Sequence, residues 1–199
     1  MDIVTSGKNI YLKNKVVSKL DLFVIDFINI LKKYADYTVV SGYVSILFGR
    51  SRGTEDIDIL IKIIDLDTFI KFYKELTGKK YWFLNAENPM ELYGMLEDKL
   101  AIRIAAKEAV IPNIEIKFIK SDLDKASLDE HKVVNIGKDT INISPIELQI
   151  AFKLYLGSDK DIEDAVYLYE IFIKYIDKKK LNQYMNILKV KGAKYGIEI

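Results

Sequence analysis

In residues 56–61 three isoleucines alternate with Asp56, Asp58 and Leu60, and this short segment constrains the chain more than any other. Ile57, Ile59 and Ile61 would share one face, as in a strand that is buried on one side. Asp56 and Asp58 would then project together from the opposite face, because alternate residues of a strand point the same way. Two carboxylates held this close raise each other's pKa unless a positive charge lies between them.

A divalent cation would balance this pair, because Mg²⁺ prefers hard oxygen ligands and is commonly held by one or two carboxylates plus phosphate oxygens. Glu115 alternates with apolar residues in segment 114–118 and could reach the same cations if its strand lies beside the first. Three carboxylates on neighbouring strands form a two-metal site for phosphoryl transfer. The plainer alternatives are a solvated sheet face for Asp56 and Asp58, and an exposed ion pair with Lys117 for Glu115.

The composition narrows the possible functions. The 199 residues, of which 50% are hydrophobic, suffice for one domain or two small ones. With 30 Lys and Arg against 29 Asp and Glu, no global positive field favours indiscriminate nucleic-acid binding. The absence of Cys and the single His131 exclude disulfides, Cys nucleophiles and His-cluster metal sites. Without a signal-peptide pattern or an apolar run that could span a bilayer, we expect a cytoplasmic protein with no membrane partner.

Hydrophobic spacing predicts an α/β (α+β) chain. Helices are expected over 18–35, 43–48, 66–77 and 89–98, and strands over 37–41, 56–61, 81–84, 100–105 and 114–119. The helix content of 121–131 stays open, and a hairpin is expected over 132–143. Ser144 as N-cap, Pro145 at the first helical position and Glu147 predict a helix to about residue 156. Two more helices, over 158–175 and 179–190, complete a helical domain (144–199) that follows a mixed-sheet domain (1–143).

Segment 41–58 resembles the signature of the nucleotidyltransferase superfamily: S-G-Y-V-S-I-L-F-G-R-S-R-G-T-E-D-I-D. In that signature a Gly-Gly or Gly-Ser turn, a short helix and an Arg-x-Thr loop precede the acidic pair. The AbiEii-like toxins and related DUF-type nucleotidyltransferases are the most similar subgroup. The resemblance implies a mixed-sheet catalytic domain, two Mg²⁺ ions and an NTP donor such as ATP. It assigns Asp56 and Asp58 to the metal-binding pair and Glu115 to the third carboxylate.

The resemblance also assigns nucleotide-binding roles around the turn. Ser41 and Gly42 match the turn that approaches the triphosphate, and Arg52 and Thr54 lie on the loop before the acidic strand. A glycine lets the backbone come close to a phosphate, and a helix that begins at Tyr43 would point free N–H groups at the anion. Glycine is also common at such turns for steric reasons alone. The bulky Tyr43 departs from the family pattern.

In the helical part, residues 151–165 resemble a Lys…Lys-Asp-x-x-Asp element of the same subgroup. The resemblance places Lys153 at the nucleotide phosphates, and Asp161 and Asp164 at the base, ribose or acceptor. Asp161 also lies three residues after Ser158, where a capping acid belongs, and Lys153 could instead sit on an exposed helix face. Six lysines within 178–197 could hold an RNA backbone or simply solvate the last helix.

These features together predict a Mg²⁺-dependent nucleotidyltransferase that moves a nucleoside monophosphate from an NTP to an acceptor hydroxyl. RNA, and tRNA in particular, is the first expected acceptor, in a toxin–antitoxin setting with a cognate antitoxin as partner. The alternatives are nucleotidylation of a protein or of a small antibiotic, and a non-catalytic, antitoxin-like binding module of the same fold. A degenerate module should have lost a carboxylate; since all three candidates remain, the sequence favours an enzyme.

Overall fold

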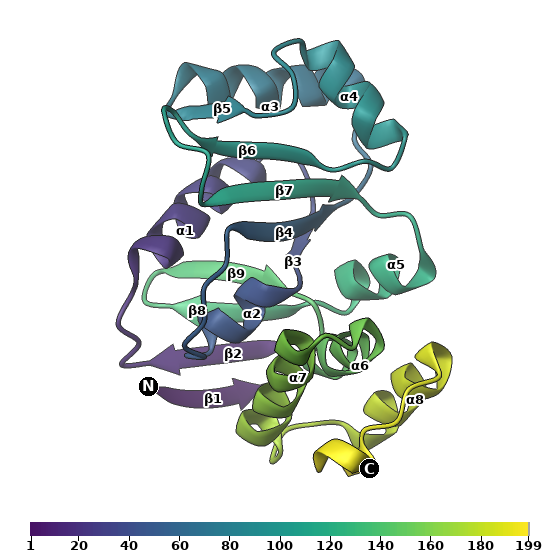
Figure 1. Cartoon of the computed structure of the whole chain (residues 1–199). Helices are drawn as coiled ribbons and strands as arrows, with labels where there is room; N and C mark the ends of the chain where they lie inside the picture. Colours follow the sequence, from purple (N-terminus) through teal and green to yellow (C-terminus); the bar gives the residue numbers. More distant parts are fainter. Residues whose placement is uncertain (199) are drawn as a thin grey trace.

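The computed structural model describes residues 1–198, which form one mixed sheet with helices packed around it (Figure 1). The strands are β1 (Asp2–Ser6), β2 (Asn9–Lys13), β3 (Tyr37–Val39), β4 (Asp56–Ile61), β5 (Tyr81–Phe83), β6 (Ile102–Ala106), β7 (Asn113–Phe118), β8 (Lys132–Ile136) and β9 (Asp139–Ile143). Their order in the sheet is β1-β2-β8-β9-β3-β4-β7-β6-β5. The pairs β2–β8, β3–β9 and β4–β7 are parallel, and the others are antiparallel. The expected α/β class is confirmed.

The helices lie close to their predicted positions. They are α1 (Lys19–Leu31), α2 (Gly42–Leu47), α3 (Leu66–Gly78), α4 (Pro89–Glu97), α5 (Asp122–Asp129), α6 (Ile146–Leu156), α7 (Asp159–Phe172) and α8 (Lys178–Leu188), followed by the short 3-10 turn η1 (Ala193–Tyr195). The segment left open by the sequence is helix α5. Ser121 and Asp124 begin it with a reciprocal capping box, which satisfies two N–H groups that a helix start otherwise leaves free. None of the helices in residues 1–198 is long and apolar enough to cross a membrane.

The predicted cap at Ser144 is wrong. Helix α6 has Pro145 at its N-cap position, and no side chain caps it. The hydroxyl of Ser144 is instead hydrogen-bonded to the hydroxyl of Ser127 at 3.0 Å. Glu147 accepts a hydrogen bond from the backbone N–H of Asp177 at 2.9 Å. Both side chains thus make tertiary contacts, with α5 and with the start of α8, and a local sequence pattern cannot show these.

One face of the sheet carries the hydrophobic core. Ile57, Ile59 and Ile61 of β4 are buried, as their alternation predicts. Helices α1, α3 and α4 cover this face with aromatic side chains. Phe27 of α1 packs edge-on against Tyr81 of β5, with ring centroids 5.5 Å apart. Each fully buried side chain of this kind contributes roughly 2 kcal/mol to stability, so the isoleucine face anchors β4 and leaves its aspartates on the other side.

The helical part packs against the α/β part through a common core. Phe48, which follows α2, meets Phe172 of α7 edge-on at 4.7 Å. The hydroxyl of Tyr167 donates a hydrogen bond to the backbone carbonyl of Phe48 at 2.9 Å. Residues from both sides of position 143 belong to one hydrophobic cluster. The division into domains 1–143 and 144–199 stays a prediction; helices α6 and α7 are held beside the loop that precedes β4.

Candidate active site

The three predicted carboxylates lie on two adjacent strands. Strands β4 and β7 run parallel in a register that pairs Asp58 with Glu115 and Asp56 with Asn113. Because alternate residues share a face, Asp56, Asp58 and Glu115 all project from the face opposite the isoleucines. The two strands are therefore neighbours, as the assignment of Glu115 to this site requires.

Two basic residues that the sequence did not assign to the site neutralise part of this charge. The Lys117 Nζ atom lies 3.2 Å from Asp58 Oδ1 and 3.3 Å from Glu115 Oε2. Arg103, opposite Glu115 on β6, donates a hydrogen bond from Nε to Glu115 Oε1 at 2.7 Å. The ion pair with Lys117, the plainer alternative for Glu115, is thus present, but it is not an exposed one, because Glu115 is buried and Lys117 also bridges to Asp58. Its position two residues after Glu115, on the same strand face, was the available signal.

Burial and neighbouring charges move the pKa values of these groups in different directions. Burial raises the pKa of Asp58, and the negative charges of Asp56 and Glu115 add to the rise against the opposing effect of Lys117. Burial alone would raise the pKa of Glu115 as well. The hydrogen bond from Arg103 and the charge of Lys117 outweigh it and hold that pKa below its usual value. Of the facing pair, Asp58 is therefore the carboxylate whose ionised form is disfavoured, chiefly because it is buried.

Of the three predicted metal-binding carboxylates, only two are placed to bind a divalent cation as the structure stands. Among residues 1–198, no three His, Cys, Asp or Glu side chains are grouped so that they could hold a metal ion as they stand. Glu115 is engaged by Arg103 and Lys117. Asp56 and Asp58 still offer hard oxygen ligands from one strand face, and burial disfavours the ionised form of Asp58, which a bound cation would stabilise. These two carboxylates fit a magnesium ion, and Glu115 can join them only if Lys117 moves aside.

Thr54 and Arg52 of the predicted nucleotide-binding loop make contacts that hold the loop in place. The hydroxyl of Thr54 donates a hydrogen bond to the carbonyl oxygen of Asp56 at 2.8 Å, which fixes the start of β4. A Cβ atom on Gly42 would lie only 3.0–3.2 Å from the guanidinium of Arg52. The space beside this glycine is therefore taken by Arg52. Ser41 has a left-handed backbone (φ 65°), an uncommon conformation for a residue that has a side chain.

Arg52 belongs to a buried ion network that joins the loop to the helical part. Asp164 of α7 pairs with Arg52, with Arg50 at 3.0 Å and with Lys153 at 2.8 Å, and its side chain is fully buried. Lys153 also contacts Asp161 at 2.7 Å and is only 2% exposed. The exposed-face alternative for Lys153 is thus wrong. Asp161 accepts hydrogen bonds from Lys153 and from the Ser158 hydroxyl, so it serves both the helix start and the network.

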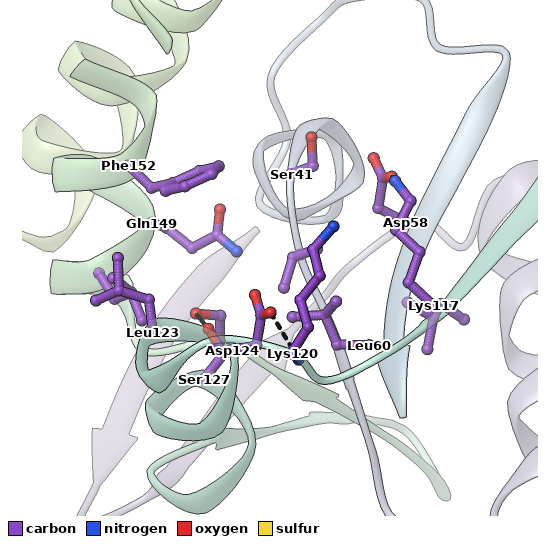
Figure 2. Close-up of a pocket in the computed structure, with 14 residues that line it drawn as sticks. Ser41, Asp58, Leu60, Lys117, Lys120, Leu123, Asp124, Ser127, Gln149 and Phe152 are labelled. Atoms are coloured by element: carbon purple, nitrogen blue, oxygen red, sulfur yellow. Dashed lines mark hydrogen bonds and ion pairs between the residues drawn. The ribbon is translucent and has the colours of Figure 1, made fainter. Parts of the chain in front are cut away.

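A cavity of about 250 Å³ opens beside the carboxylates, between the sheet and helices α5 and α6 (Figure 2). Of the predicted residues, Ser41 and Asp58 line it. Its remaining wall includes three residues that the sequence did not single out, because their roles depend on how α5 and α6 pack: Lys120, Gln149 and Phe152. A second hollow of about 680 Å³ lies on the side of Asp56 and is lined by the loop residues Arg50 to Glu55 with Lys160 and Glu163.

Comparison with known proteins identifies the fold. No family model matches the chain, and no curated protein matches it. Among solved structures, an antigenic nucleotidyltransferase-like protein from Paracoccidioides brasiliensis aligns with a TM-score of 0.54 and 14% identity, over 91% of this chain and 93% of that chain. The antibiotic-resistance factor ANT(2'')-Ia aligns with a TM-score of 0.56 and 9% identity, over 91% and 95%. The nucleotidyltransferase toxin MenT4 from Mycobacterium tuberculosis H37Rv aligns with a TM-score of 0.47 and 15% identity, over 87% and 64%.

The first two of these likenesses span nearly the whole of both chains. At such identities they show the fold alone, and that fold is the one that the resemblance in segment 41–58 implied. The chain has the nucleotidyltransferase fold.

Proposed function

We propose that this chain, with its nucleotidyltransferase fold, is an enzyme that transfers a nucleoside monophosphate from an NTP to an acceptor hydroxyl. In this reaction the acceptor oxygen forms a bond to the α-phosphorus, the bond from that phosphorus to the bridging oxygen breaks, and pyrophosphate leaves. The acceptor proton passes to a carboxylate of the site. We assign this role to Glu115, which is ionised at neutral pH; its lowered pKa makes it a weaker base than an ordinary glutamate, so the transfer depends on the bound cations lowering the pKa of the attacking hydroxyl.

One observation carries the proposal: Asp58 and Glu115 are paired in register on parallel strands, with Asp56 two residues before Asp58 on the same face. A sheet face that served only stability would not bring three carboxylates together, with Asp58 in the wall of a cavity and its pKa raised by burial. A degenerate, non-catalytic module of the same fold would be free to lose any of them. Their retention favours the enzyme over the antitoxin-like alternative.

Asp56 and Asp58 would hold Mg²⁺, with Glu115 as the third carboxylate of a two-ion site once Lys117 has moved. The bound ions would neutralise the phosphate charges and lower the pKa of the attacking hydroxyl. The hollow on the side of Asp56 is lined by Arg50, Arg52 and Lys160, whose charges suit the β- and γ-phosphates. In this proposal Ser41 and Gly42 border the triphosphate.

The ion network gives the phosphate-binding arginines their positions. Arg50 and Arg52 both contact Asp164, which Lys153 also contacts from α6. A fully buried carboxylate that holds two guanidinium groups removes much of their rotamer freedom before the nucleotide arrives. Lys153, Asp161 and Asp164 therefore act in this proposal by positioning the loop. A direct contact of Lys153 with phosphate would require it to leave two carboxylates.

We propose RNA, and tRNA first, as the acceptor, in a cytoplasmic toxin–antitoxin setting with a cognate antitoxin. In support, the basic residues of segment 178–180 begin helix α8, where Lys178 and Lys179 are exposed and Lys180 pairs with Glu130. A small hydroxylated molecule is the second candidate acceptor, since ANT(2'')-Ia, which shares the fold, is an antibiotic-resistance factor. Nucleotidylation of a protein is the third candidate.

The test is to incubate the protein with each α-³²P-labelled NTP, Mg²⁺, and either total cellular RNA, total protein or a panel of small hydroxylated antibiotics. Label that enters RNA supports the first acceptor, and label in protein or in the small molecule supports an alternative. If none of the four nucleotides labels any acceptor while the protein remains folded, the proposed enzyme function is wrong.

A further inference from the structure

Gln149 of α6 lies in the wall of the cavity beside Asp58. Only 4% of the residue is exposed to solvent. Figure 2 shows its side-chain amide directed into the cavity, with no hydrogen bond to any other residue that is drawn. Among residues 1–198, none of the buried side-chain atoms that lack a hydrogen-bond partner belongs to Gln149, so its amide atoms are open to the cavity and available to a ligand that enters it.

The residues around Gln149 describe the shape of that ligand. Phe152 lies three positions further along α6 and therefore on the same helix face. Leu123 and Leu148 add apolar walls, and Lys120 extends toward the open space in Figure 2. A flat aromatic ring, apolar walls and a single amide suit a planar heterocycle with hydrogen-bonding edges, and a nucleobase is such a ligand.

The position of the cavity favours the donor nucleotide over the acceptor as its occupant. Asp58 and Lys117 line the end nearest the sheet, and Gln149 and Phe152 belong to α6. A nucleoside with its base at α6 would direct its 5′ phosphate chain toward Asp58, and on toward Arg50 and Arg52 around Asp56. A cavity of about 250 Å³ has room for a single nucleoside, and the basic hollow around Asp56 on the phosphate side favours the donor over an acceptor nucleoside.

We propose that this cavity binds the nucleoside of the donor NTP, with its base against Phe152 and the base edge hydrogen-bonded to the Gln149 amide. This inference rests on the proposed function and adds to it the residue that selects the nucleotide. The amide both donates and accepts, so it can pair with a base edge that offers an adjacent acceptor and donor, such as adenine N7 and N6, and the cavity walls decide which base presents such an edge to Gln149.

Binding of the four NTPs and the four free nucleosides to the full chain, measured by isothermal titration calorimetry, tests the proposal. The wild-type protein is expected to prefer one NTP. Gln149→Met, which has a similar shape, should weaken the preferred NTP about tenfold and leave the others nearly unchanged. Gln149→Glu, which cannot donate when ionised, should shift the order of preference. Gln183→Met, at the other glutamine of the chain, exposed on α8, is the matched control and should change nothing.

The outcomes separate this inference from the proposed function. If Gln149→Met and Gln149→Glu both bind the four NTPs in the wild-type order and strength, or weaken all four equally, the base-reading role is overturned, while NMP transfer can still stand. Free nucleosides that bind the wild-type protein and lose affinity in the Gln149 variants, without any NMP transfer, would support the cavity and overturn the enzyme. Should Gln149→Met fail to fold, Gln149→Glu carries the same test.

Discussion

Asp58 and Glu115 face each other across two parallel strands, and one ammonium group lies between them. Lys117 Nζ is 3.2 Å from the first carboxylate and 3.3 Å from the second. The positive charge of Lys117 allows the two carboxylates to stay close together in a partly buried place. In the proposed reaction a bound cation would have the same effect. The acidic site is thus stable before any nucleotide binds, and its charge balance can be tested directly.

Removal of the aspartate pair should abolish NMP transfer. Asp56→Ala combined with Asp58→Ala deletes both oxygen donors from the strand face but leaves the isoleucine face intact. We expect incorporation of label to fall to background, with folding kept, as circular dichroism would show. Asp129→Ala, an exposed aspartate at the end of α5, is the matched control and should retain full transfer. Unchanged labelling in the double variant would refute the metal-binding assignment.

Replacement of Lys117 should move the acid limb of the pH–activity profile to higher pH. Lys117 lowers the pKa of both Asp58 and Glu115, so Lys117→Met raises both. In the free enzyme Lys117 still lies between these groups, which must be ionised to bind the cations, so kcat/KM for the variant should be lost at a higher pH than for the wild type. Rates of NMP incorporation measured between pH 5 and pH 9 check this. Lys62→Met, an exposed lysine after β4, should leave the profile unshifted, and an unshifted profile for Lys117→Met would contradict the prediction.

Asp164 should be among the polar residues that matter most for stability. Asp164→Ala removes a fully buried carboxylate and leaves Lys153 and Arg52 short of negative charge in a buried place. We expect a loss of about 3 kcal/mol in the free energy of unfolding, measured by urea denaturation. The neighbouring Glu163 also pairs with Arg50, but its side chain is 67% exposed. Glu163→Gln should therefore cost less than about 1 kcal/mol, and equal losses in the two variants would contradict the network.

Glu75 should make stability depend on pH in acid. Lys33, Tyr34 and Lys79 donate hydrogen bonds or charge to it and lower its pKa from 4.5 to about 2. Because the pKa is lower in the folded state, Glu75 stabilises the fold above its unfolded pKa, and this contribution is lost as pH falls from about 4.5 toward 2.

Glu75→Gln removes that contribution, so the variant should be less stable than the wild type at pH 7 and match it near pH 2. Denaturation midpoints measured at pH 7, 4 and 2.5 give the comparison. Glu170→Gln, an exposed glutamate on α7, serves as control. A stability difference that stays constant across this range would show that Glu75 does not carry the effect.

The sequence predicted those parts of the fold that depend on local periodicity. Strand β4 was predicted at its observed bounds. Alternating isoleucines point to one face of a strand, and that face is the one buried in the core. The hairpin β1–β2 was not predicted. Its strands are short, and β2 is held by a parallel partner far along the chain. Ser144 shows the same limit. The local sequence fits a helix cap, but the Ser144 hydroxyl is hydrogen-bonded to Ser127 instead of capping α6.

The candidate site divides in the same way. The adjacency of Asp58 and Glu115 could be expected once both strands had been assigned, because the two strands carry acids at matching positions. The bridging role of Lys117 and the room that Gly42 leaves for Arg52 depend on register and on loop packing. No spacing in a single sequence encodes these. The role of Gln149 could not be predicted for the same reason, since it depends on the cavity beside α5 and α6 that this residue lines.

The parallel pairing of β2 with β8 has a consequence for how the chain is made. Almost the whole α/β part lies between these two strands, so the first hairpin emerges from the ribosome long before its partner has been translated. Strands β4 and β7 can pair somewhat earlier, because β7 is translated just before β8. The acidic site on β4 and β7 can therefore form during synthesis, while the β1–β2 hairpin stays unpaired until β8 has been translated. Ribosome-bound intermediates should carry the acidic site first and an exposed sheet edge beside it.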